Sequence, residues 1–578
     1  MTRELILIKR DNVLKKTNKY YLGAWCLHQH EEFSSRLVKY PWDDRETMYK
    51  DFRTIKRYIH KYEKIFTKVL NKIHKTSHSY LFWKVQLYPW LGYTIISFFH
   101  SFRMYQSLNY KNTKWKAVAT NINRLDLAPG SSKEFISHFL NDDWNSYIFG
   151  KTMEHFSNCH VIWENRDYKL IAGNNGHNVF KNFLLKTEKR LKSLFKIINR
   201  KKNFFLYQDY LPNGEKLKID LYLNRKFCPD FPTESLTRIK PNEKARNELA
   251  NKIKNDSKDC FDIILQKNLF TLFPTHLLEN FLELKRCVAH STFPALPKLI
   301  LTSIGQAYDD PFKYYYGSQP AHVKRFIISH GGYGVAKYSY DEDHDNSICD
   351  KYLTWGWKFK KKQVKLGIQK TLNKKISANK NGGLLFLAIT TPKINYTLDS
   401  CPRAGQNLSE IRNHIKFFKR IDVEIQKSFT VRAFEHGDQW LYNRRWLRSK
   451  LAFYPKIMGT EKSFYKVIKN FRIAVVTWNA TVVRELFSLD FPSLLIWDNT
   501  KYETHSSASE IYKNLVKANL LFYNPFKAAD FLNSIWSNID SWWFNPKTRN
   551  ARQTFCDTFA RPFNTSQFKQ LLKSSVTI

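Results

Sequence analysis

The chain has 578 residues, with 94 Lys and Arg against 51 Asp and Glu, and a formal net charge of +43. This length suits two or three domains rather than one hydrophobic core, and 43% hydrophobic with 16% aromatic residues excludes a disordered chain. The positive charge favours anionic partners such as phosphorylated substrates, nucleic acid or the anionic inner leaflet of a membrane, although the abundance of Lys, Asn, Ile, Tyr and Phe is equally typical of an AT-rich genome.

The chain begins with MTRELILIKRDN, whose apolar run is too short for a signal peptide. The most apolar window, YPWLGYTIISFFHSF, holds about 15 residues, fewer than the ~20 of a membrane-spanning helix. The eight cysteines are scattered without a CxxC pair. This argues against a zinc site and a disulfide scaffold, and it indicates reduced thiols in a cytosol.

The first half of the sequence predicts short strands at residues 3–8 and 20–26, followed by helices. In residues 40–74 apolar and aromatic residues recur at spacings of three and four, which predicts a long amphipathic helix. A second helical stretch follows at about 80–105. The region from about 110 to 290 is mixed, with a strand SNCHVIWEN, a basic amphipathic helix NVFKNFLLKTEKRLKSLFKIINRKKN and a helix LFPTHLLENFLELKRCV.

In the second half, short continuous apolar runs alternate with helical patterns, which is typical of buried parallel strands in α/β units. These runs lie at residues 296–303, 325–332, 381–392, 429–437, 471–476, 491–498 and 518–524. A Lys- and Asn-rich link at about 360–383 separates two sets of them. We therefore predict an N-terminal domain, 1–375, with helical insertions at about 45–290, and a C-terminal domain, 376–578.

The stretch RFIISHGGYG places His330, Gly331 and Gly332 directly after a predicted strand. In open parallel sheets the ligand lies at the carboxyl ends of the strands. Glycines adopt positive φ readily and let the backbone approach a ligand, free N–H groups hold an anion, and an imidazole acts as an acid or a base. The alternative is a tight turn with an incidental histidine. We favour a functional site at these three residues, because Tyr333 and a further glycine follow them directly.

The stretch VVTWNATVVREL places Thr477, Asn479 and Thr481 at a strand-to-helix turn. Asn479 is expected to cap the helix, and Thr481 lies in its first turn. Free N–H groups and hydroxyls at a helix N-terminus suit a phosphate. From the motif alone, a plain cap is the favoured interpretation.

Charged residues give further candidates, each with a structural alternative. Glu503 follows a predicted strand and could bind a ribose or sugar hydroxyl, or face a helix dipole. Arg432 on a buried strand requires a partner, which we expect to be anionic. Asp44 could act as a catalytic base across a cleft, or cap the next helix while pairing with Arg45. The run DEDHD at 341–345 could bind a divalent cation, but a solvated loop is the favoured interpretation.

Several motifs occur together in one order: LGAWC, YPWDDR, LPKLILTS, HGGYG, DKYLTWGW, VVTWNAT and a WW pair near the C-terminus. In this combination the chain resembles, over nearly its whole length, a bacterial family of transferases from O-antigen and other surface-carbohydrate loci. That family is similar to GT-B glycosyltransferases and to capsule and teichoic-acid polymerising enzymes. The resemblance implies an α/β, GT-B-like fold, in which two Rossmann-like domains face a cleft.

The resemblance implies that Thr477, Asn479 and Thr481 contact the donor phosphate, and that Glu503 corresponds to an acidic residue after the next strand. It also implies a role for His330, whereas the other roles given below come from the residues themselves. In such enzymes a histidine after a strand of the N-terminal domain lies at the cleft, and in this chain it corresponds to His330. We predict His330 and Asp44 as catalytic. The predicted substrate-binding residues are Gly331, Gly332, Tyr333, Arg45, Arg432, Thr477, Asn479, Thr481 and Glu503, and no metal ligand is predicted. The chain departs from the family pattern at Ser329, where Gln is usual, and at Tyr88, where Gly is usual.

The expected function is transfer of a glycosyl or substituted-phosphate group from a nucleotide-activated donor to a surface-polysaccharide or lipid-linked acceptor. We expect no cofactor besides the donor, and a cytoplasmic location, peripheral on the inner face of the membrane. Two alternatives remain open. One is a basic nucleic-acid-binding protein, which no helix-turn-helix, zinc-finger, KH or RRM signature supports, so no nucleic acid is expected. The other is an inactive transferase-fold scaffold.

Overall fold

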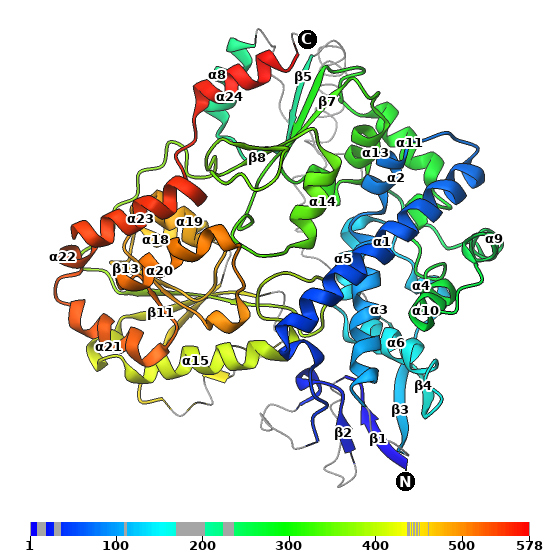
Figure 1. Ribbon diagram of the computed structural model, residues 1–578, viewed down its shortest axis with the longest axis horizontal. Coiled ribbons are helices and arrows are strands. Elements are labelled where there is room, and N and C mark those ends of the chain that lie inside the picture. The colour runs from blue at the N-terminus through cyan, green and yellow to red at the C-terminus, as the bar shows by residue number, and fades with distance from the viewer. Residues whose placement is uncertain are drawn as a thin grey trace, which may run out of the picture.

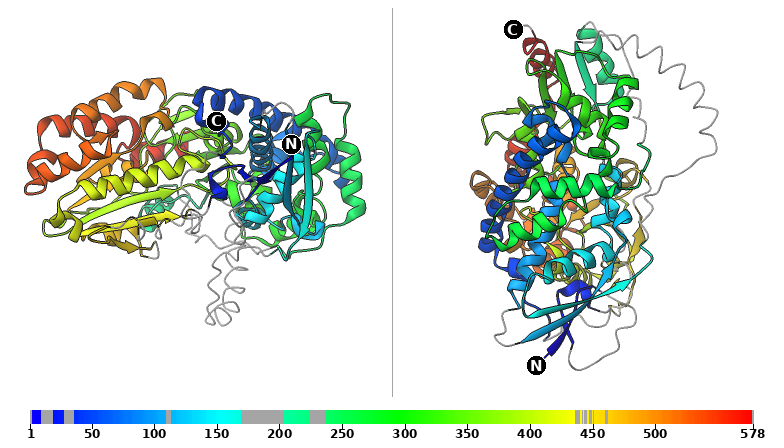
Figure 2. Two further views of the ribbon diagram at one scale, coloured as in Figure 1. Left: turned by 90° about the horizontal axis from the view of Figure 1, so that it is seen from below. Right: turned by 90° about the vertical axis from the view of Figure 1, so that its right-hand side faces the viewer.

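Three parallel sheets organise the chain (Figure 1). The computed structural model describes residues 2–8, 19–27, 36–108, 113–168, 203–223, 236–435, 440, 442, 445–446, 449, 451–459 and 462–576. Helices lie beside each sheet, and the two termini lie at opposite ends of the molecule (Figures 1 and 2). This arrangement confirms the predicted α/β fold class.

The N-terminal sheet has the strand order β2-β1-β3-β4. Its strands are β1 (Thr2–Ile6), β2 (Lys19–Tyr21), β3 (Lys114–Asn121) and β4 (Cys159–Asn165). The first and fourth correspond to predicted strands. Of the strand predicted at 20–26 only the beginning is confirmed, because residues 24–26 form a 3-10 turn. In β3 most alternate side chains are buried, which is the period of a strand with one covered face. The first two strands pair within this four-stranded sheet and not with the sheet that carries the His-Gly-Gly motif.

The first half of the chain also forms a group of helices, of which the helix Asn213–Tyr222 packs Ile219 into the core of the middle sheet rather than against this sheet. The helices are α1 (Arg45–His74), α2 (Tyr80–Leu87), α3 (Trp90–Gln106), α4 (Arg124–Leu127), α5 (Ser132–Phe139), α6 (Asp142–Met153), α8 (Asn213–Tyr222), α9 (Glu243–Ile253), α10 (Cys260–Asn268) and α11 (Phe281–His290). The long predicted helix is α1, which buries its apolar residues at the expected spacing. The predicted stretch at 80–105 is two helices that meet at Pro89, since proline lacks the N–H group of a helix interior.

Of two other helices predicted in this region, one is shorter than expected and the other cannot be compared with the structure. The helix predicted at 272–288 begins only at Phe281, because residues 275–277 form a separate 3-10 turn. The basic helix predicted at 178–203 lies almost entirely outside the described residues.

The middle sheet has the order β5-β6-β7-β8-β9 and carries the His-Gly-Gly motif at the end of β7. Its strands are β5 (Phe204–Tyr207), β6 (Leu299–Thr302), β7 (Lys324–Ile328), β8 (Lys351–Thr354) and β9 (Gln363–Lys365). The helices between them are α12 (Gly305–Tyr308), α13 (Asp310–Ser318) and α14 (Tyr340–Ile348). All residues of β6 are buried, as the continuous apolar run predicts.

The C-terminal sheet has the order β12-β11-β10-β13-β14-β15. Its strands are β10 (Leu384–Thr390), β11 (Phe429–Glu435), β12 (Lys456–Met458), β13 (Ile473–Val476), β14 (Ser493–Ile496) and β15 (Leu521–Phe522). Its helices are α15 (Asn407–Arg420), α16 (Val423–Lys427), α18 (Phe464–Ile468), α19 (Thr481–Ser488), α20 (Ser509–Lys517), α21 (Pro525–Ile535), α22 (Ile539–Trp543) and α23 (Pro546–Phe559). The middle and C-terminal sheets lie on either side of the predicted boundary at residue 375.

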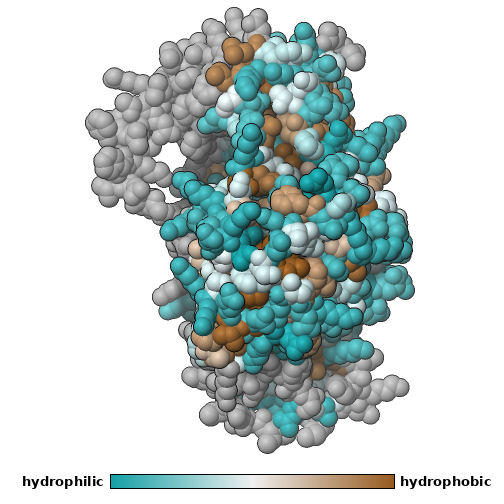
Figure 3. All heavy atoms as spheres, turned by 90° about the vertical axis from the view of Figure 1, so that its left-hand side faces the viewer, coloured by the Kyte–Doolittle hydropathy of each residue, from teal (hydrophilic) through white to brown (hydrophobic). Residues whose placement is uncertain are grey.

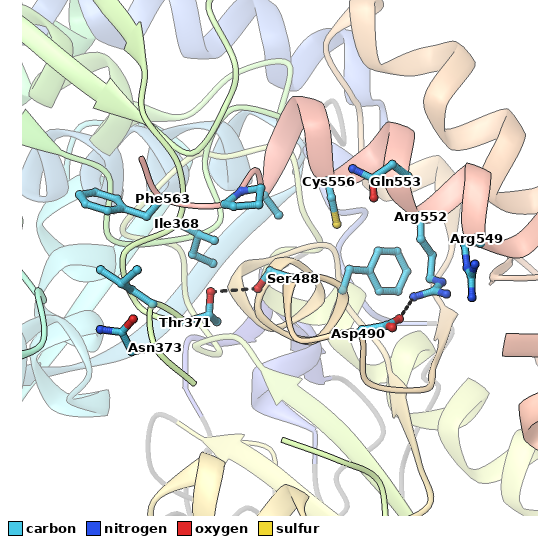
Figure 4. Close-up of a pocket in the computed structure, with 14 residues that line it drawn as sticks. Ile368, Thr371, Asn373, Ser488, Asp490, Arg549, Arg552, Gln553, Cys556 and Phe563 are labelled. Atoms are coloured by element: carbon cyan, nitrogen blue, oxygen red, sulfur yellow. Dashed lines mark hydrogen bonds and ion pairs between the residues drawn. The ribbon is translucent and has the colours of Figure 1, made fainter. Parts of the chain in front are cut away.

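The end of the chain crosses back to the middle sheet. After α23, helix α24 (Thr565–Ser574) packs Phe568 and Leu572 against buried residues of the middle sheet (Figure 1). The outgoing and returning segments touch, because Ile368 N–H donates to the Arg561 carbonyl at 3.0 Å. A pocket of about 480 Å³ lies beside this crossing. In it, Ser488 at the end of α19 donates to Thr371 at 3.0 Å (Figure 4).

No helix among the described residues combines the length and the apolar character needed to cross a membrane. On the face seen in Figure 3, hydrophilic side chains predominate and apolar ones are scattered among them.

Candidate active site

The His-Gly-Gly loop of the middle sheet lies directly against the N-terminus of α19 from the C-terminal half. A β-carbon on Gly332 would lie 2.8 Å from the Ala480 Cα and 2.8 Å from the Thr481 backbone nitrogen. A β-carbon on Gly331 would lie 3.2 Å from the Thr481 Oγ1. Two motifs about 150 residues apart, each at the carboxyl end of a strand, therefore meet at one junction, where parallel α/β sheets bind ligands.

The glycines serve this junction through their lack of a side chain rather than through their φ angles. Within the motif only Gly334 has a positive φ, of 86°. The expectation of positive φ at Gly331 and Gly332 is thus wrong, and the close approach at Gly332 is instead to another helix.

Substitution of Gly332 by alanine is expected to destabilise the protein by about 1–3 kcal/mol, the usual cost of overpacking. The added methyl group meets backbone atoms of α19, which cannot turn aside as a side chain can. Gly214→Ala is the matched control, since a β-carbon there meets nothing within 4 Å. Thermal unfolding of both variants checks this, and equal melting temperatures would contradict it.

His330 is half-buried beside this junction and is neutral near pH 7. Burial, and secondly the positive charge of Lys370, lower the pKa of His330 to about 4, while a hydrogen bond to the Ser303 backbone opposes the shift. Within the described chain the Nδ1 atom of His330 has no hydrogen-bond partner. The Tyr333 ring stands edge-on to the imidazole at 5.4 Å. A neutral imidazole with a nitrogen that lacks a partner can bind a substrate group.

The N-terminus of α19 carries no side-chain cap. Its N-cap residue is Ala480, which makes no side-chain cap hydrogen bond. Asn479 instead accepts a hydrogen bond from the Tyr512 hydroxyl at 2.7 Å, so the predicted cap by Asn479 is wrong. Thr477 donates to the Leu387 carbonyl at 3.1 Å and is buried. Thr481 alone of the three predicted residues has its hydroxyl at the junction.

Arg484, which the sequence analysis did not single out, lies one turn further along α19. Its side chain is 0% exposed, and Nη2 donates to the Tyr333 carbonyl at 3.2 Å. Among the described residues Nε and Nη1 have no hydrogen-bond partner. Burial lowers the pKa of Arg484, but a guanidinium stays charged in proteins. A buried positive charge therefore lies behind the uncapped helix N-terminus.

Two lysines of the interdomain link lie near α19, and one of them, Lys370, adds positive charge near His330. Lys370 and Lys374 both lie close enough to Glu485 of α19 for its charge to raise their pKa values, although burial lowers both overall. Burial in turn raises the pKa of Glu485. The Lys- and Asn-rich composition of this link predicts only a domain boundary, so neither lysine is expected at the site from the sequence.

Asp341 is the carboxyl group near this junction with the most distinctive environment. Tyr88 and Tyr93 donate to the same oxygen, Oδ1, at 3.0 and 3.1 Å. Burial, and secondly the charge of Asp399, raise the pKa of Asp341 to about 7. The Asp341 charge also acts on Tyr333, whose ring contacts His330. A half-buried carboxyl that titrates near neutrality is suited to general acid–base chemistry.

The DEDHD run is therefore not a solvated loop, because residues 341–345 lie within α14. Its carboxylates point to different partners: Asp341 to the two tyrosines, Asp343 to Lys56 and Lys360, and Asp345 to Gln306. No group of three or more potential metal ligands occurs in the described ranges. The cation-binding alternative for this run thus gains no support.

The remaining predicted residues have identifiable partners. Arg45 and Glu503 form a two-point ion pair between α1 and the C-terminal half, with Nη2 and Oε2 2.9 Å apart. Asp44 caps α1, accepting from Glu46 N–H at 3.1 Å, as its structural alternative predicted, but the expected pairing with Arg45 is replaced by the pair of Arg45 with Glu503. Arg432 donates to the Lys462 carbonyl at 2.7 Å, so this contact is to backbone rather than to an anion. The roles of these residues in catalysis or substrate binding stay predictions.

Comparison with known proteins identifies the family. The model of the LIC12162 family transferases matches residues 4–574, so the chain belongs to that family. This confirms the resemblance that the motifs indicated. Together with the parallel sheets and their helices, it defines a transferase of α/β architecture. No curated protein matches the chain by sequence.

Several solved structures match parts of this chain at low similarity. The S. aureus MnaA–UDP complex has 11% identity and a TM-score of 0.35, with 64% of this chain and 95% of that chain covered. The wall teichoic acid polymerase TagF has 10% identity and a TM-score of 0.29, with 69% and 96% covered. Acinetobacter baumannii MurG has 8% identity and a TM-score of 0.27, with 69% and 97% covered. Similarity at this level identifies neither a substrate nor an activity.

Proposed function

We propose that the chain transfers a glycosyl or substituted-phosphate group from a nucleotide-activated donor to a surface-polysaccharide or lipid-linked acceptor. The observation that carries this proposal is the junction of the His-Gly-Gly loop with the uncapped N-terminus of α19, behind which Arg484 is buried. Helix N–H groups and a guanidinium form a positive site that suits a phosphate. A donor phosphate bound there would lie beside His330.

In this proposal Asp341 acts as the general base. Its ionised carboxylate takes the proton of an acceptor hydroxyl while the acceptor oxygen forms a bond to the transferred group. The bond between that group and the nucleotide phosphate breaks, and the leaving phosphate keeps the electron pair. The N–H groups of α19, with the charges of Arg484 and Lys370, stabilise the negative charge that develops. His330, neutral at this pH, bonds to the substrate through Nδ1.

We further propose that the acceptor belongs to O-antigen or other surface-carbohydrate synthesis, on the inner face of the cytoplasmic membrane. The formal charge of +43 would attract the enzyme to anionic lipid. Flotation with vesicles of phosphatidylglycerol or of phosphatidylcholine alone tests this part. Equal binding to the two vesicle types would contradict it.

Calorimetric titration of the full chain with UDP-, GDP-, CDP- and CMP-linked sugars tests the main proposal. We expect saturable binding of one of these donors. An inactive scaffold would bind none of them, and a nucleic-acid-binding protein would instead bind an oligonucleotide with a steep salt dependence. Either result would overturn the proposal.

Substitution of Arg484 by methionine is expected to weaken donor binding about 10- to 100-fold, the range for loss of a charged hydrogen-bonding group. Methionine fills a similar space, and two buried nitrogen atoms that lack partners among the described residues disappear with the guanidinium. The melting temperature is therefore expected to stay the same or rise. Arg286→Met, at a side chain of α11 that is 73% exposed, is the control. Unchanged donor binding in Arg484→Met would remove Arg484 from the site.

A further inference from the structure

We propose that a second pocket, outside the transfer junction, binds an acidic sugar, meaning a saccharide unit that carries a phosphate or a carboxylate. The pocket has a volume of about 390 Å³, within the usual range for small-molecule sites. Its walls come from α1, from residues 334–339 after the His-Gly-Gly loop, from α14, from residues 359–363 and from His505. We call it the α1–α14 pocket. His330, Asp341 and Thr481 do not line it.

Positive charge predominates in the α1–α14 pocket. Four cationic side chains line it against two carboxylates, and they are Arg53, Lys56, Lys337 and Lys360 against Glu342 and Asp343. The Nζ atoms of Lys56 and Lys360 each lie 2.5 Å from a carboxylate oxygen of Asp343, so both lysines are paired with this carboxylate.

The other two cations leave the pocket with unbalanced positive charge. Lys337 lies 4.3 Å and Arg53 5.5 Å from the centre of the same Tyr49 ring. Within the described ranges, neither has a carboxylate at ion-pair distance. Two cations that share one ring and lack a counter-charge provide a place for an anion.

Two buried hydroxyl groups in the pocket wall lack partners. Tyr338 is 5% and Ser339 6% exposed, and neither side-chain oxygen has a hydrogen-bond partner among the described residues. Ser339 directly precedes α14 but its side chain does not cap the helix. Buried hydroxyls normally find a hydrogen-bond partner, because leaving them unpaired is costly. A ligand with hydroxyl groups of its own would supply one.

The remaining walls are aromatic. Tyr49 and Phe52 come from α1, and Phe359 stacks on His505 with ring centres 4.0 Å apart. Apolar and aromatic walls with a few well-placed polar groups are typical of small-molecule sites. Flat rings, free hydroxyls and a surplus of cations together fit the faces, the hydroxyls and the anionic group of an acidic sugar.

The place of the α1–α14 pocket gives it a role in the proposed transfer. It adjoins the HGGYG motif at Gly334, whose N–H donates to Glu342 in the wall at 3.0 Å. We infer that the bound sugar is a unit of the acceptor chain next to the reacting end. This role depends on the proposed function, whereas binding in the pocket does not.

Calorimetry on the full chain, without nucleotide, tests the site with glucose 6-phosphate, glucuronate, inorganic phosphate and glucose. Both acidic sugars are expected to bind, phosphate more weakly, and glucose without detectable heat. Lys337→Ala is expected to weaken binding of glucose 6-phosphate about tenfold, the effect of losing one charged contact. Arg53→Ala gives a second, independent variant.

Lys72→Ala is the matched control, because it also removes one positive charge and lies on α1, the helix of Arg53, about 28 Å from Arg53 at 1.5 Å per residue. Its binding is expected to equal that of the unaltered chain. Equal weakening in Lys72→Ala and Lys337→Ala would show attraction by overall charge and overturn the site. Failure of glucose 6-phosphate to bind, or phosphate binding as tight as the sugar phosphate, would overturn the acidic-sugar assignment.

The same variants separate this site from the transfer junction. Lys337→Ala is expected to leave binding of the nucleotide donor unchanged, and Arg484→Met to leave binding of glucose 6-phosphate unchanged. If a donor binds but no acidic sugar does, only the assignment of the α1–α14 pocket is overturned. If the acidic sugar binds but no donor does, the proposed transfer fails alone.

Discussion

Replacement of Asp341 by asparagine is expected to lower the transfer rate at pH 8 by about 100- to 10,000-fold, the usual contribution of a general base. The substitution keeps the geometry, because asparagine retains the oxygen to which Tyr88 and Tyr93 donate. It removes only the ability to accept a proton. Transfer of labelled sugar under saturating donor measures the effect. Asp530→Asn is the control, since Asp530 is half-exposed in a surface pair with Arg420.

The pH dependence of the rate gives a second readout for Asp341. Its pKa of about 7 means that the carboxyl is protonated, and inactive as a base, at lower pH. We therefore expect the rate to rise with pH through about 7 and then level off. The asparagine variant should lack this rise. A rise near pH 7 that persists in the variant would assign the titration to another group.

The stability of the same variant separates a catalytic role from a structural one. Asp341 has a folded pKa above its unfolded value of about 3.9. Between these values the folded state holds a proton that the unfolded state has lost, so stability falls as pH rises. Asp341→Asn should therefore melt at a higher temperature than the unaltered chain at pH 8, with no gain near pH 4. A lower melting temperature at pH 8 would indicate that the carboxylate supports the fold.

The strands of the middle and C-terminal sheets could be predicted because the signal for each is local. Runs such as residues 296–303 and 491–498 are continuously apolar, and a strand buried on both faces requires that. The edge strand β9 has the sequence QVK, which gives no such signal. The division of the strands into three sheets depends on pairing between distant segments. Leu5 of β1, for example, pairs with Ala117 of β3, and no local pattern encodes this.

The meeting of the two motifs could be predicted from the rule that ligands bind at the carboxyl ends of parallel strands, whereas the other residues of the site could not. Arg484 in a helical pattern indicates a solvated face, and it is buried only because the loop at Tyr333 covers it. Asp341 stands in a run of polar residues, and its raised pKa comes from burial and from Asp399, 58 residues away. Burial by distant segments leaves no mark in the neighbouring sequence.

Replacement of His330 by alanine is expected to lower kcat about 100-fold or more, within the range for a group that acts on the transition state. Because its pKa is about 4, His330 is neutral from pH 6 to 9, and its loss should lower the rate equally across that range.

The choice of substitution at His330 distinguishes a contact with the substrate from packing. Glutamine has an amide that can still donate to the Ser303 backbone and offer a second polar atom to the substrate. We therefore expect His330→Gln to recover part of the rate lost in His330→Ala, with KM changed less than kcat in both. An effect on donor affinity alone would make His330 a binding residue, since a group equally bound before and during reaction alters KM and not kcat. A rate equal to that of the unaltered chain would place the reacting atoms elsewhere in the junction.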